Sequence, residues 1–160
     1  MIREIRIDEA LWERSSALRR EDWIASIRDL LHDGHLGKAG DHTLVVRAEL
    51  RAIVCTVLDP HGAVRATHTV SADDLGPHVE EYFAVIRKLR AGGEHLSSAR
   101  MTAFDMAKKV VHDGAARTLA RTLPGLAHDH ATYRRLFSLF FSLVVDVTKH
   151  GMNAHRRHGR

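Results

Sequence analysis

The feature that most constrains this chain is an apolar segment near its C-terminus. Between residues 136 and 147, a run of Leu, Phe and Val is interrupted only by Ser138, Ser142 and Asp146. A helix that is apolar on nearly every side is buried over most of its surface, and this run is shorter than the roughly 20 residues that span a bilayer. It therefore predicts an apolar central helix near the C-terminus of a soluble core, with Asp129 or Thr132 near its N-cap.

Residues 1–148 are predicted to form a single domain, followed by a flexible, basic, His-containing tail at residues 149–160. Four of the 24 Lys and Arg residues lie in the tail, which lacks Asp and Glu, so the rest of the chain holds 20 basic and 20 acidic residues. The net charge of +4 therefore belongs to the tail. We expect non-specific phosphate contacts from the tail and no further binding of nucleic acid, because the balanced body lacks a basic face.

The sequence predicts a cytoplasmic protein without a membrane segment. The residues after Met1 mix charge and apolarity, unlike a secretory signal, and no apolar run is long enough to cross a bilayer. Cys55 is the only cysteine, which excludes intramolecular disulfides and thiolate-rich zinc sites. Its apolar neighbours predict a small core side chain rather than a nucleophile.

Three β-rich runs in the first half of the chain predict an antiparallel meander. They cover residues 43–47, 51–58 and 63–70, and Pro and Gly stand in turn positions between the last two. Residues 2–7 alternate apolar and charged side chains, as an edge strand does.

Helices are predicted before and after this meander along the chain. One covers about residues 20–32, and two others begin near Ser71 and near Ser97 or Ser98, before the apolar helix. Asp113 and Gly114 predict a break within the helix that begins near Ser98. Strands in one block and helices in another are typical of an α+β fold, here a small antiparallel β-meander packed against three or four helices.

One polar group of residues has the spacing of a functional site. Asp105, Lys108, Lys109 and His112 fall within one arc of the helix that begins near Ser98. An Asp–His pair with lysines nearby is sufficient for acid–base catalysis or for anion binding. A solvated helix flank with ordinary ion pairs would have the same spacing, and this alternative stays open.

Arg134 and Arg135 lie in the first turn of the predicted apolar helix. The helix dipole disfavours a cation there by about 0.3–1 kcal/mol. We expect compensation by a carboxylate such as Asp105 or Asp129, or by a bound anion held with the free backbone N–H groups. Internal salt bridges are the simpler of these explanations.

Thirteen histidines raise the question of a metal site. The local groups at residues 32–35 and 128–130 have neither a His-Glu-x-x-His pattern nor paired cysteines, and zinc normally requires three or four converging ligands. No glycine-rich phosphate loop follows a predicted strand. We therefore expect no metal and no cofactor.

The polar arc and the two arginines also carry a family resemblance. The chain resembles uncharacterised protein family two-six-two, a bacterial family, at Asp105-Met106, Lys108-Lys109 and His112, and later at Arg134-Arg135-Leu136-Phe137. Members of that family have Asp-Met-Gly-Arg-Arg, then His-Asn-Glu-Gly, and later Ala-Arg-Arg-Leu-Phe. The resemblance spans roughly residues 20–145. It implies that Asp105, His112, Arg134 and Arg135 belong to one site, and it implies no activity.

This chain departs from the family pattern at two places. Lys108-Lys109 replaces two arginines, and Asp113-Gly114-Ala115 stands where Asn-Glu-Gly is usual. A lysine cannot make the bidentate contacts of a guanidinium. Any role of those arginines or of that Glu would therefore be altered here.

Taken together, the sequence predicts a homodimeric binding or regulatory module for an anionic ligand, either a phosphate-bearing small molecule or an acidic segment of a partner protein. Lys108, Lys109, Arg134 and Arg135 are the predicted ligand-binding residues. One alternative is a small hydrolase or phospho-transfer enzyme that uses His112 as base and Asp105 as its partner. The other is a structural subunit that acts through protein–protein contacts.

The predicted site carries a geometric condition. His112 lies about three turns before the connection at residues 124–128, so an unbroken helix would hold it away from Arg134. We therefore expect a break near Gly114 that turns His112 and Arg134 toward one crevice.

Overall fold

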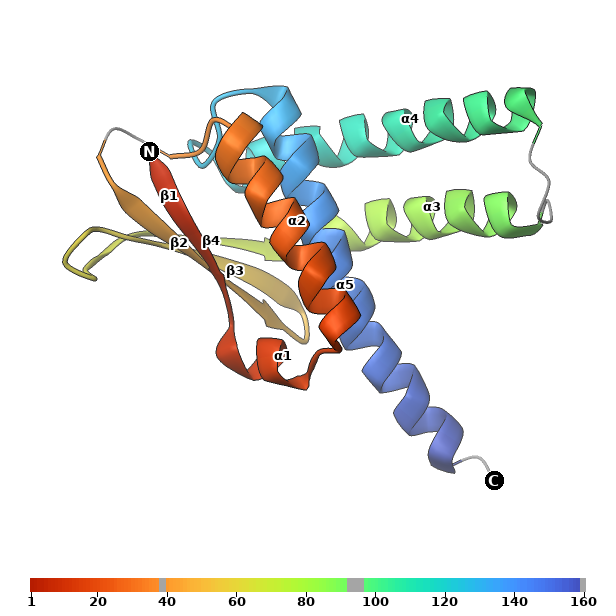
Figure 1. Cartoon of the computed structure of the whole chain (residues 1–160), viewed down its shortest axis with the longest axis horizontal. Helices are drawn as coiled ribbons and strands as arrows, with labels where there is room; N and C mark the ends of the chain where they lie inside the picture. The colour runs from red at the N-terminus through yellow and green to blue at the C-terminus, as the bar shows by residue number, and fades with distance from the viewer. Residues whose placement is uncertain (38–39, 92–96, 159–160) are drawn as a thin grey trace.

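The structure, a computed structural model of the whole chain, describes residues 1–37, 40–91 and 97–158, with side chains as far as residue 144. Figure 1 shows its elements. In chain order they are β1 (Ile2–Ile7), α1 (Glu9–Arg14), α2 (Ala17–Asp33), β2 (His42–Glu49), β3 (Ala52–Leu58), β4 (Val64–Ser71), α3 (Ala72–Ala91), α4 (Ser98–Thr122) and α5 (His130–His158).

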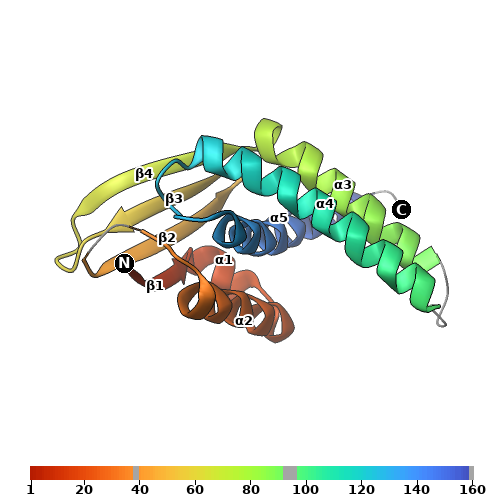
Figure 2. The same cartoon turned by 90° about the horizontal axis from the view of Figure 1, so that it is seen from above.

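The strands form one sheet in the order β1-β2-β3-β4. Figure 2 shows the long helices on one face of this sheet, where α5 packs against both α2 and α4. The α+β class and the meander of β2, β3 and β4 are confirmed, because these strands pair antiparallel.

The expectation of a purely antiparallel sheet is wrong. β1 pairs with β2 in the parallel direction. Parallel neighbours need a long crossover between them, and α1 and α2 provide it. Five helices form within the described residues instead of three or four, because the segment after β1, for which no helix was predicted, contains α1 and buries Leu11.

The apolar segment forms the middle of α5, and Leu136, Phe137, Leu139, Phe140 and Leu143 have no exposed surface. α5 is not an apolar helix over its whole length, because it continues to His158 through the polar residues of the tail. The domain boundary at residue 148 and the flexibility of the tail stay predictions. Among the residues that the structure describes, no helix is long and apolar enough to cross a membrane.

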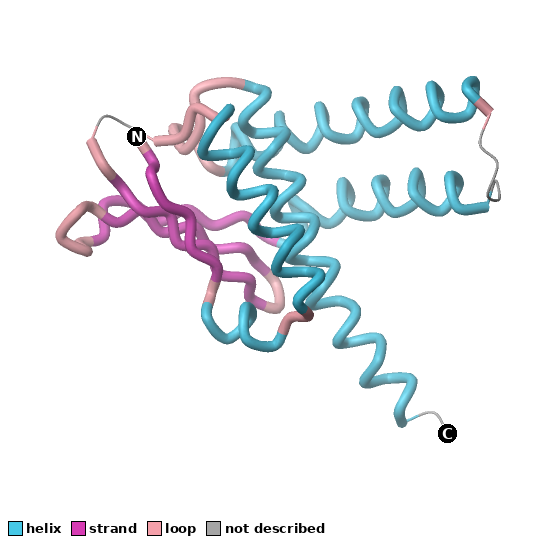
Figure 3. Tube along the Cα trace, viewed as in Figure 1, coloured by secondary structure: helices cyan, strands magenta, loops and turns pink. Residues whose placement is uncertain are grey.

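The predicted break near Gly114 is wrong, since α4 is one helix from Ser98 to Thr122. Figure 3 shows α3 and α4 extending side by side from the sheet. A glycine inside a helix costs only about 1 kcal/mol relative to alanine. Packing of α4 against α3 and α5 outweighs this cost, and Val111, Ala115, Ala116 and Leu119 around Gly114 are buried.

Candidate functional site

The structure brings all six candidate residues to one pocket between α4 and α5. The pocket has a volume of about 400 Å³. Its walls are Asp105, Lys108, Lys109 and His112 from α4, with Ala131, Arg134, Arg135 and Ser138 from α5. His112 and Arg134 therefore line one crevice, although α4 does not break between them.

The connection between the helices explains how an unbroken α4 reaches Arg134. After Leu123 the chain runs back along α4, so that α5 begins beside Asp113 rather than beside Thr122. The return covers about nine residues of α4, roughly 14 Å at 1.5 Å per residue. The residue count along α4 placed His112 too far from Arg134, because it assumed that α5 begins beside the end of α4. The connection instead covers this distance before α5 begins.

Hydrogen bonds to the segment that follows α2, and to α5, hold the connection in this path. The N–H of His128 donates to the carbonyl of His35 at 2.9 Å, and Ala127 forms an isolated bridge with Leu36. The buried hydroxyl of Tyr133 donates to the carbonyl of Leu123 at 2.8 Å. The first turn of α5 is therefore fixed relative to α4.

Asp129 caps the start of α5, and it is one of the two residues predicted to lie near the N-cap of this helix. Its Oδ1 accepts hydrogen bonds from the N–H of Thr132 at 2.7 Å and from the Thr132 hydroxyl at 2.6 Å. Nδ1 of His35 lies 2.6 Å from the other carboxylate oxygen. The bonds from Thr132, followed by the bond from His35, hold the pKa of Asp129 below its usual range. This carboxylate serves the helix start and does not pair with Arg134 or Arg135.

Asp113 is the carboxylate that meets Arg134. Its Oδ1 accepts a hydrogen bond from Nε2 of His130 at 3.0 Å and lies 3.3 Å from Nε of Arg134. The second contact is an ion pair without the alignment of a hydrogen bond, which leaves the buried Nε of Arg134 without an acceptor. The bond from His130 and then the charge of Arg134 hold the pKa of Asp113 below its usual range.

His112 is buried, with 5% of its surface exposed. Its Nδ1 donates to the carbonyl of Lys108 at 2.8 Å, so the neutral ring carries its proton on Nδ1 and Nε2 is the acceptor. Tyr82 and Phe137 pack against the imidazole edge to face, with ring centroids 4.9 Å and 5.1 Å away. Burial lowers the pKa of His112, and the charges of Lys108 and Arg134 lower it further against the opposing effect of the bond to the carbonyl.

Asp105 does not orient His112. It lies two turns earlier on α4, is exposed, and makes no hydrogen bond or ion pair within the part of the chain that the structure describes. The Nδ1 proton of His112 already goes to the Lys108 carbonyl. The geometry therefore joins Asp105 to the pocket wall but does not form the Asp–His pair that the sequence suggested.

The lining of the pocket is cationic. Four cations face one carboxylate, that of Asp105. Among the described residues Arg134 has an ion pair with Asp113, whereas Lys108, Lys109 and Arg135 have none. The charges of Lys109 and Arg135 still act at longer range on Asp113 and Asp33. Such a set of cations favours an anion in the pocket.

Sequence reasoning missed three residues around this site. Asp113 was treated as a helix breaker, His130 as part of a possible metal-binding group, and Tyr82 was not singled out. The position of Asp113 next to His112 in the sequence could have indicated that Asp113 belongs to the site. Its pairing with His130 could not have been predicted, because it depends on the path of the connection. No group of three possible metal ligands converges among the described residues.

The chain is similar to known proteins along most of its length. A model of the Uncharacterised protein family (UPF0262) matches residues 1–146. A UPF0262 protein of Paracoccus denitrificans is 29% identical over 150 residues, which covers 88% of this chain and 93% of the relative. A UPF0262 protein of Methylobacterium radiotolerans is 24% identical over 144 residues, covering 88% and 90%. One of Brucella canis is 24% identical over 142 residues, covering 85% and 88%.

These matches confirm the resemblance and extend it toward the N-terminus, because the family model includes β1 and α1. No solved structure matches this chain.

Proposed function

We propose that this chain, which belongs to the Uncharacterised protein family (UPF0262), is a binding or regulatory module whose α4–α5 pocket accepts a small phosphate-bearing anion. The observation that carries the proposal is the charge of the pocket, where four cations face one carboxylate. Bringing four cations together beside a single lining carboxylate costs free energy, and a bound anion offsets that cost.

The cations have different tasks in this proposal. The guanidinium groups of Arg134 and Arg135 offer paired donors that match two phosphate oxygens. Lys108 and Lys109 supply point charges in place of the two arginines of the family pattern, so they attract the ligand without fixing its orientation. The N-terminus of α5 adds positive potential from its dipole.

His112 gives the pocket a hydrogen-bond acceptor. A neutral imidazole with its proton on Nδ1 presents Nε2 as an acceptor. This nitrogen is suited to a hydroxyl of the ligand, or to the proton of a singly protonated phosphate. The volume of about 400 Å³ lies in the range of small-molecule sites and favours a metabolite over a segment of a partner protein.

A second candidate function is hydrolysis or phospho-transfer with His112 as general base. The observation in its favour is that His112 is neutral, buried and oriented by a backbone carbonyl, which is the state a base requires. Asp105 has no part in this version. The structural-subunit alternative relies on the exposed Met106 and Val110 of α4.

The proposal is tested by calorimetric titration of the protein with inorganic phosphate and with pyrophosphate at low salt. Arg134→Gln should weaken binding by about 1.5–3 kcal/mol, the value of a charge-assisted hydrogen bond. Arg47→Gln is the matched control, because Arg47 is an exposed arginine on β2 that pairs with Glu49. Binding that is undetectable, or equally strong in both variants, would overturn the proposal.

The enzyme candidate needs a separate measurement. If His112 is a base, the protein should turn over a generic phosphomonoester, and His112→Gln should abolish turnover while phosphate still binds. Phosphate binding without turnover would support the binding module and exclude the enzyme.

A further inference from the structure

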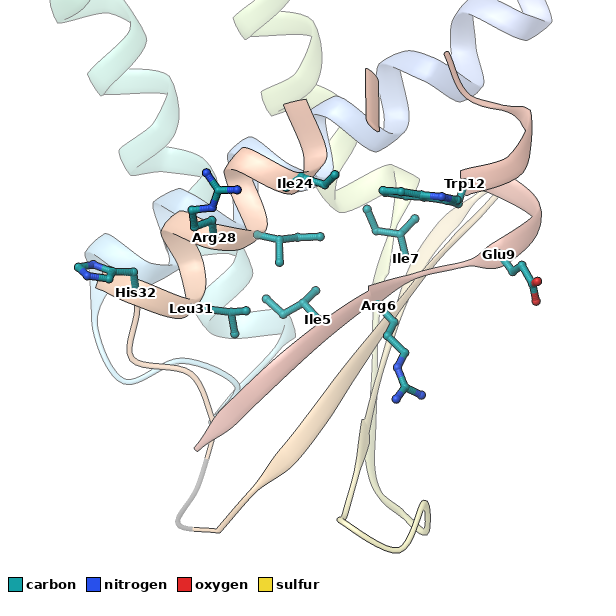
Figure 4. A pocket seen from close by; sticks show the side chains of 10 residues that line it. Ile5, Arg6, Ile7, Glu9, Trp12, Ile24, Arg28, Leu31 and His32 are labelled. Carbon is teal, nitrogen blue, oxygen red and sulfur yellow. The ribbon is translucent and has the colours of Figure 1, made fainter. Parts of the chain in front are cut away.

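A second, larger hollow lies on another side of the molecule, between β1 and α2. It has a volume of about 780 Å³. Figure 4 shows its apolar walls, with Ile5 and Ile7 of β1 directed toward Leu31 and Ile24 of α2. Ile24 is 43% exposed. The ends of the groove differ in charge, since Arg28 lies with His32 at one end and Glu9 lies at the other, and of the two residues at the first end Arg28 carries the positive charge.

The groove opens along a sheet edge with free backbone groups. Among the described strands, β1 is the first in the sheet and has β2 as its only strand neighbour. The N–H of Ile2 donates to the carbonyl of Leu36 at 3.2 Å, so the free part of the edge begins after Ile2. The N–H of Asp8 donates to the carbonyl of Val46 in β2 at 2.9 Å, so even-numbered residues direct their backbone groups toward β2. By alternation, Ile5 and Ile7 direct theirs toward the open edge.

The two faces of β1 differ in the same alternating way. Ile5 is buried with 7% exposure on the groove side. Glu4 and Arg6 lie on the other face and pair with each other, with Arg6 Nε donating to Glu4 Oε1 at 2.8 Å. Their side chains are 51% and 58% exposed. A free edge that carries both an apolar row and an opposite-charge pair is suited to a strand of matching pattern.

We propose that this edge and groove form the contact between two copies of the chain, in which β1 pairs antiparallel with β1 about a two-fold axis at Ile5. The inference does not depend on the α4–α5 pocket. A second copy of the chain is the proposed partner, because the charges of β1 are complementary to those of another β1 in one register.

Charge selects that register. Antiparallel pairing about a two-fold axis centres on one residue of β1. An axis at Arg3 falls on the register shift between Ile2 and Glu4, and an axis at Ile7 leaves the flanking pairs beyond the end of β1, so the axis lies at Glu4, Ile5 or Arg6. An axis at Glu4 places two carboxylates opposite each other, and an axis at Arg6 places two guanidinium groups opposite each other, both unfavourable. With the axis at Ile5, Glu4 of each copy faces Arg6 of the other, in the closely spaced type of pair.

The axis at Ile5 also agrees with the charges at the two ends of the groove. A two-fold axis reverses direction, so the end of the groove with Glu9 is turned toward the end with Arg28 and His32 in the other copy. The Ile5 side chains meet on the groove side and extend the apolar surface between the two copies of α2. The result is one continuous sheet of eight strands, made from two four-stranded sheets.

The test uses charge reversal, with mass measured by light scattering after gel filtration. The wild type should have twice the 18.0 kDa mass of one chain. Glu4→Arg and Arg6→Glu should each be monomeric, because each places like charges opposite each other. A mixture of the two variants should form a one-to-one dimer, since every cross-strand pair is then opposite in charge.

Both side chains are exposed, so the variants should keep the circular dichroism of the wild type. A monomeric wild type, a dimer that survives either reversal, or variants that fail to associate when mixed would overturn the proposal. A monomer that binds an extended peptide along β1 would assign the groove to another partner and would also overturn it.

Cross-linking gives an independent measurement of the register. Residues that face each other in closely spaced antiparallel pairs lie near enough for a disulfide, so Glu4→Cys/Arg6→Cys should form a covalent dimer on oxidation. Neither single variant should cross-link, because position 4 does not face position 4, nor position 6 position 6. Cys55 does not interfere, since burial raises the pKa of its thiol to about 12. Equal cross-linking of the single variants would exclude this register.

Discussion

Asp113 on α4 lies 3.3 Å from Nε of Arg134 on α5, and the contact joins the two helices beside the cationic pocket that Arg134 lines. The same carboxylate oxygen accepts a hydrogen bond from His130 in the first turn of α5. Asp113 therefore places Arg134 and also competes with a ligand for its charge. This double role makes the strength of anion binding adjustable at one residue.

Asp113→Asn should raise the affinity of the pocket for inorganic phosphate several-fold. The amide keeps an oxygen that accepts from His130, but it removes the negative charge beside Arg134. Calorimetric titration at low salt measures the change, with Asp41→Asn, an exposed carboxylate distant in sequence, as control. Unchanged or weaker binding would show that Asp113 only positions Arg134.

Thr132→Val should destabilise the fold by about 1–3 kcal/mol, the cost of unsatisfied buried partners. The Thr132 side chain has no exposed surface, and its hydroxyl accepts from the N–H of His35 at 2.9 Å and donates to Asp129. Valine has nearly the same shape but leaves the N–H of His35 without its acceptor and removes one of the two hydrogen bonds that Thr132 donates to Asp129. Urea denaturation measures the loss, and Thr132→Ser, which keeps the hydroxyl, should lose less. Equal losses in the two variants would point to packing instead.

Phe140→Ala should cost about 3–5 kcal/mol through lost burial and a residual cavity. Phe140 has no exposed surface in the middle of α5. Phe141, its neighbour, is only partly buried, so Phe141→Ala should cost less. Thermal or chemical unfolding of both variants makes the comparison. A tolerated change at Phe140 would contradict its place in the core.

His112 should make the fold lose stability as the pH falls below neutrality. Burial lowers the pKa of His112 from its ordinary 6.5, so the unfolded chain takes up this proton at a higher pH than the folded chain. The stability is therefore complete above about pH 6.5 and is lost as the pH falls toward the folded value. Asp113 and Asp129, whose pKa values lie below 3.8, stay charged over this range.

The pH dependence is measured by urea denaturation at about pH 7.5 and about pH 5.5, on either side of an ordinary imidazole pKa. His112→Gln, which cannot titrate, should lose less stability between the two conditions than the wild type. An identical loss would assign the pH dependence to the other histidines.

Local patterns in the sequence determined most of the elements of this protein. Strand alternation located β2, β3 and β4 to within a few residues, and Ser71 and Ser97 cap α3 and α4 as their positions before those helices predict. The spacing of Asp105, Lys108 and His112 placed them on one face of a helix. These features follow from periodicity and from hydrogen bonds between residues close in sequence.

Tertiary structure decided how these elements meet. The parallel direction of β1, the continuity of α4 through Gly114 and the pairing of Asp113 with His130 all depend on contacts between segments distant in sequence. The sequence places Arg134 far from His112 along the chain, and only the return of residues 123–129 along α4 brings both into one pocket. Periodicity describes which face of a helix a residue occupies, whereas the path of a connection depends on the packing energy of the whole core.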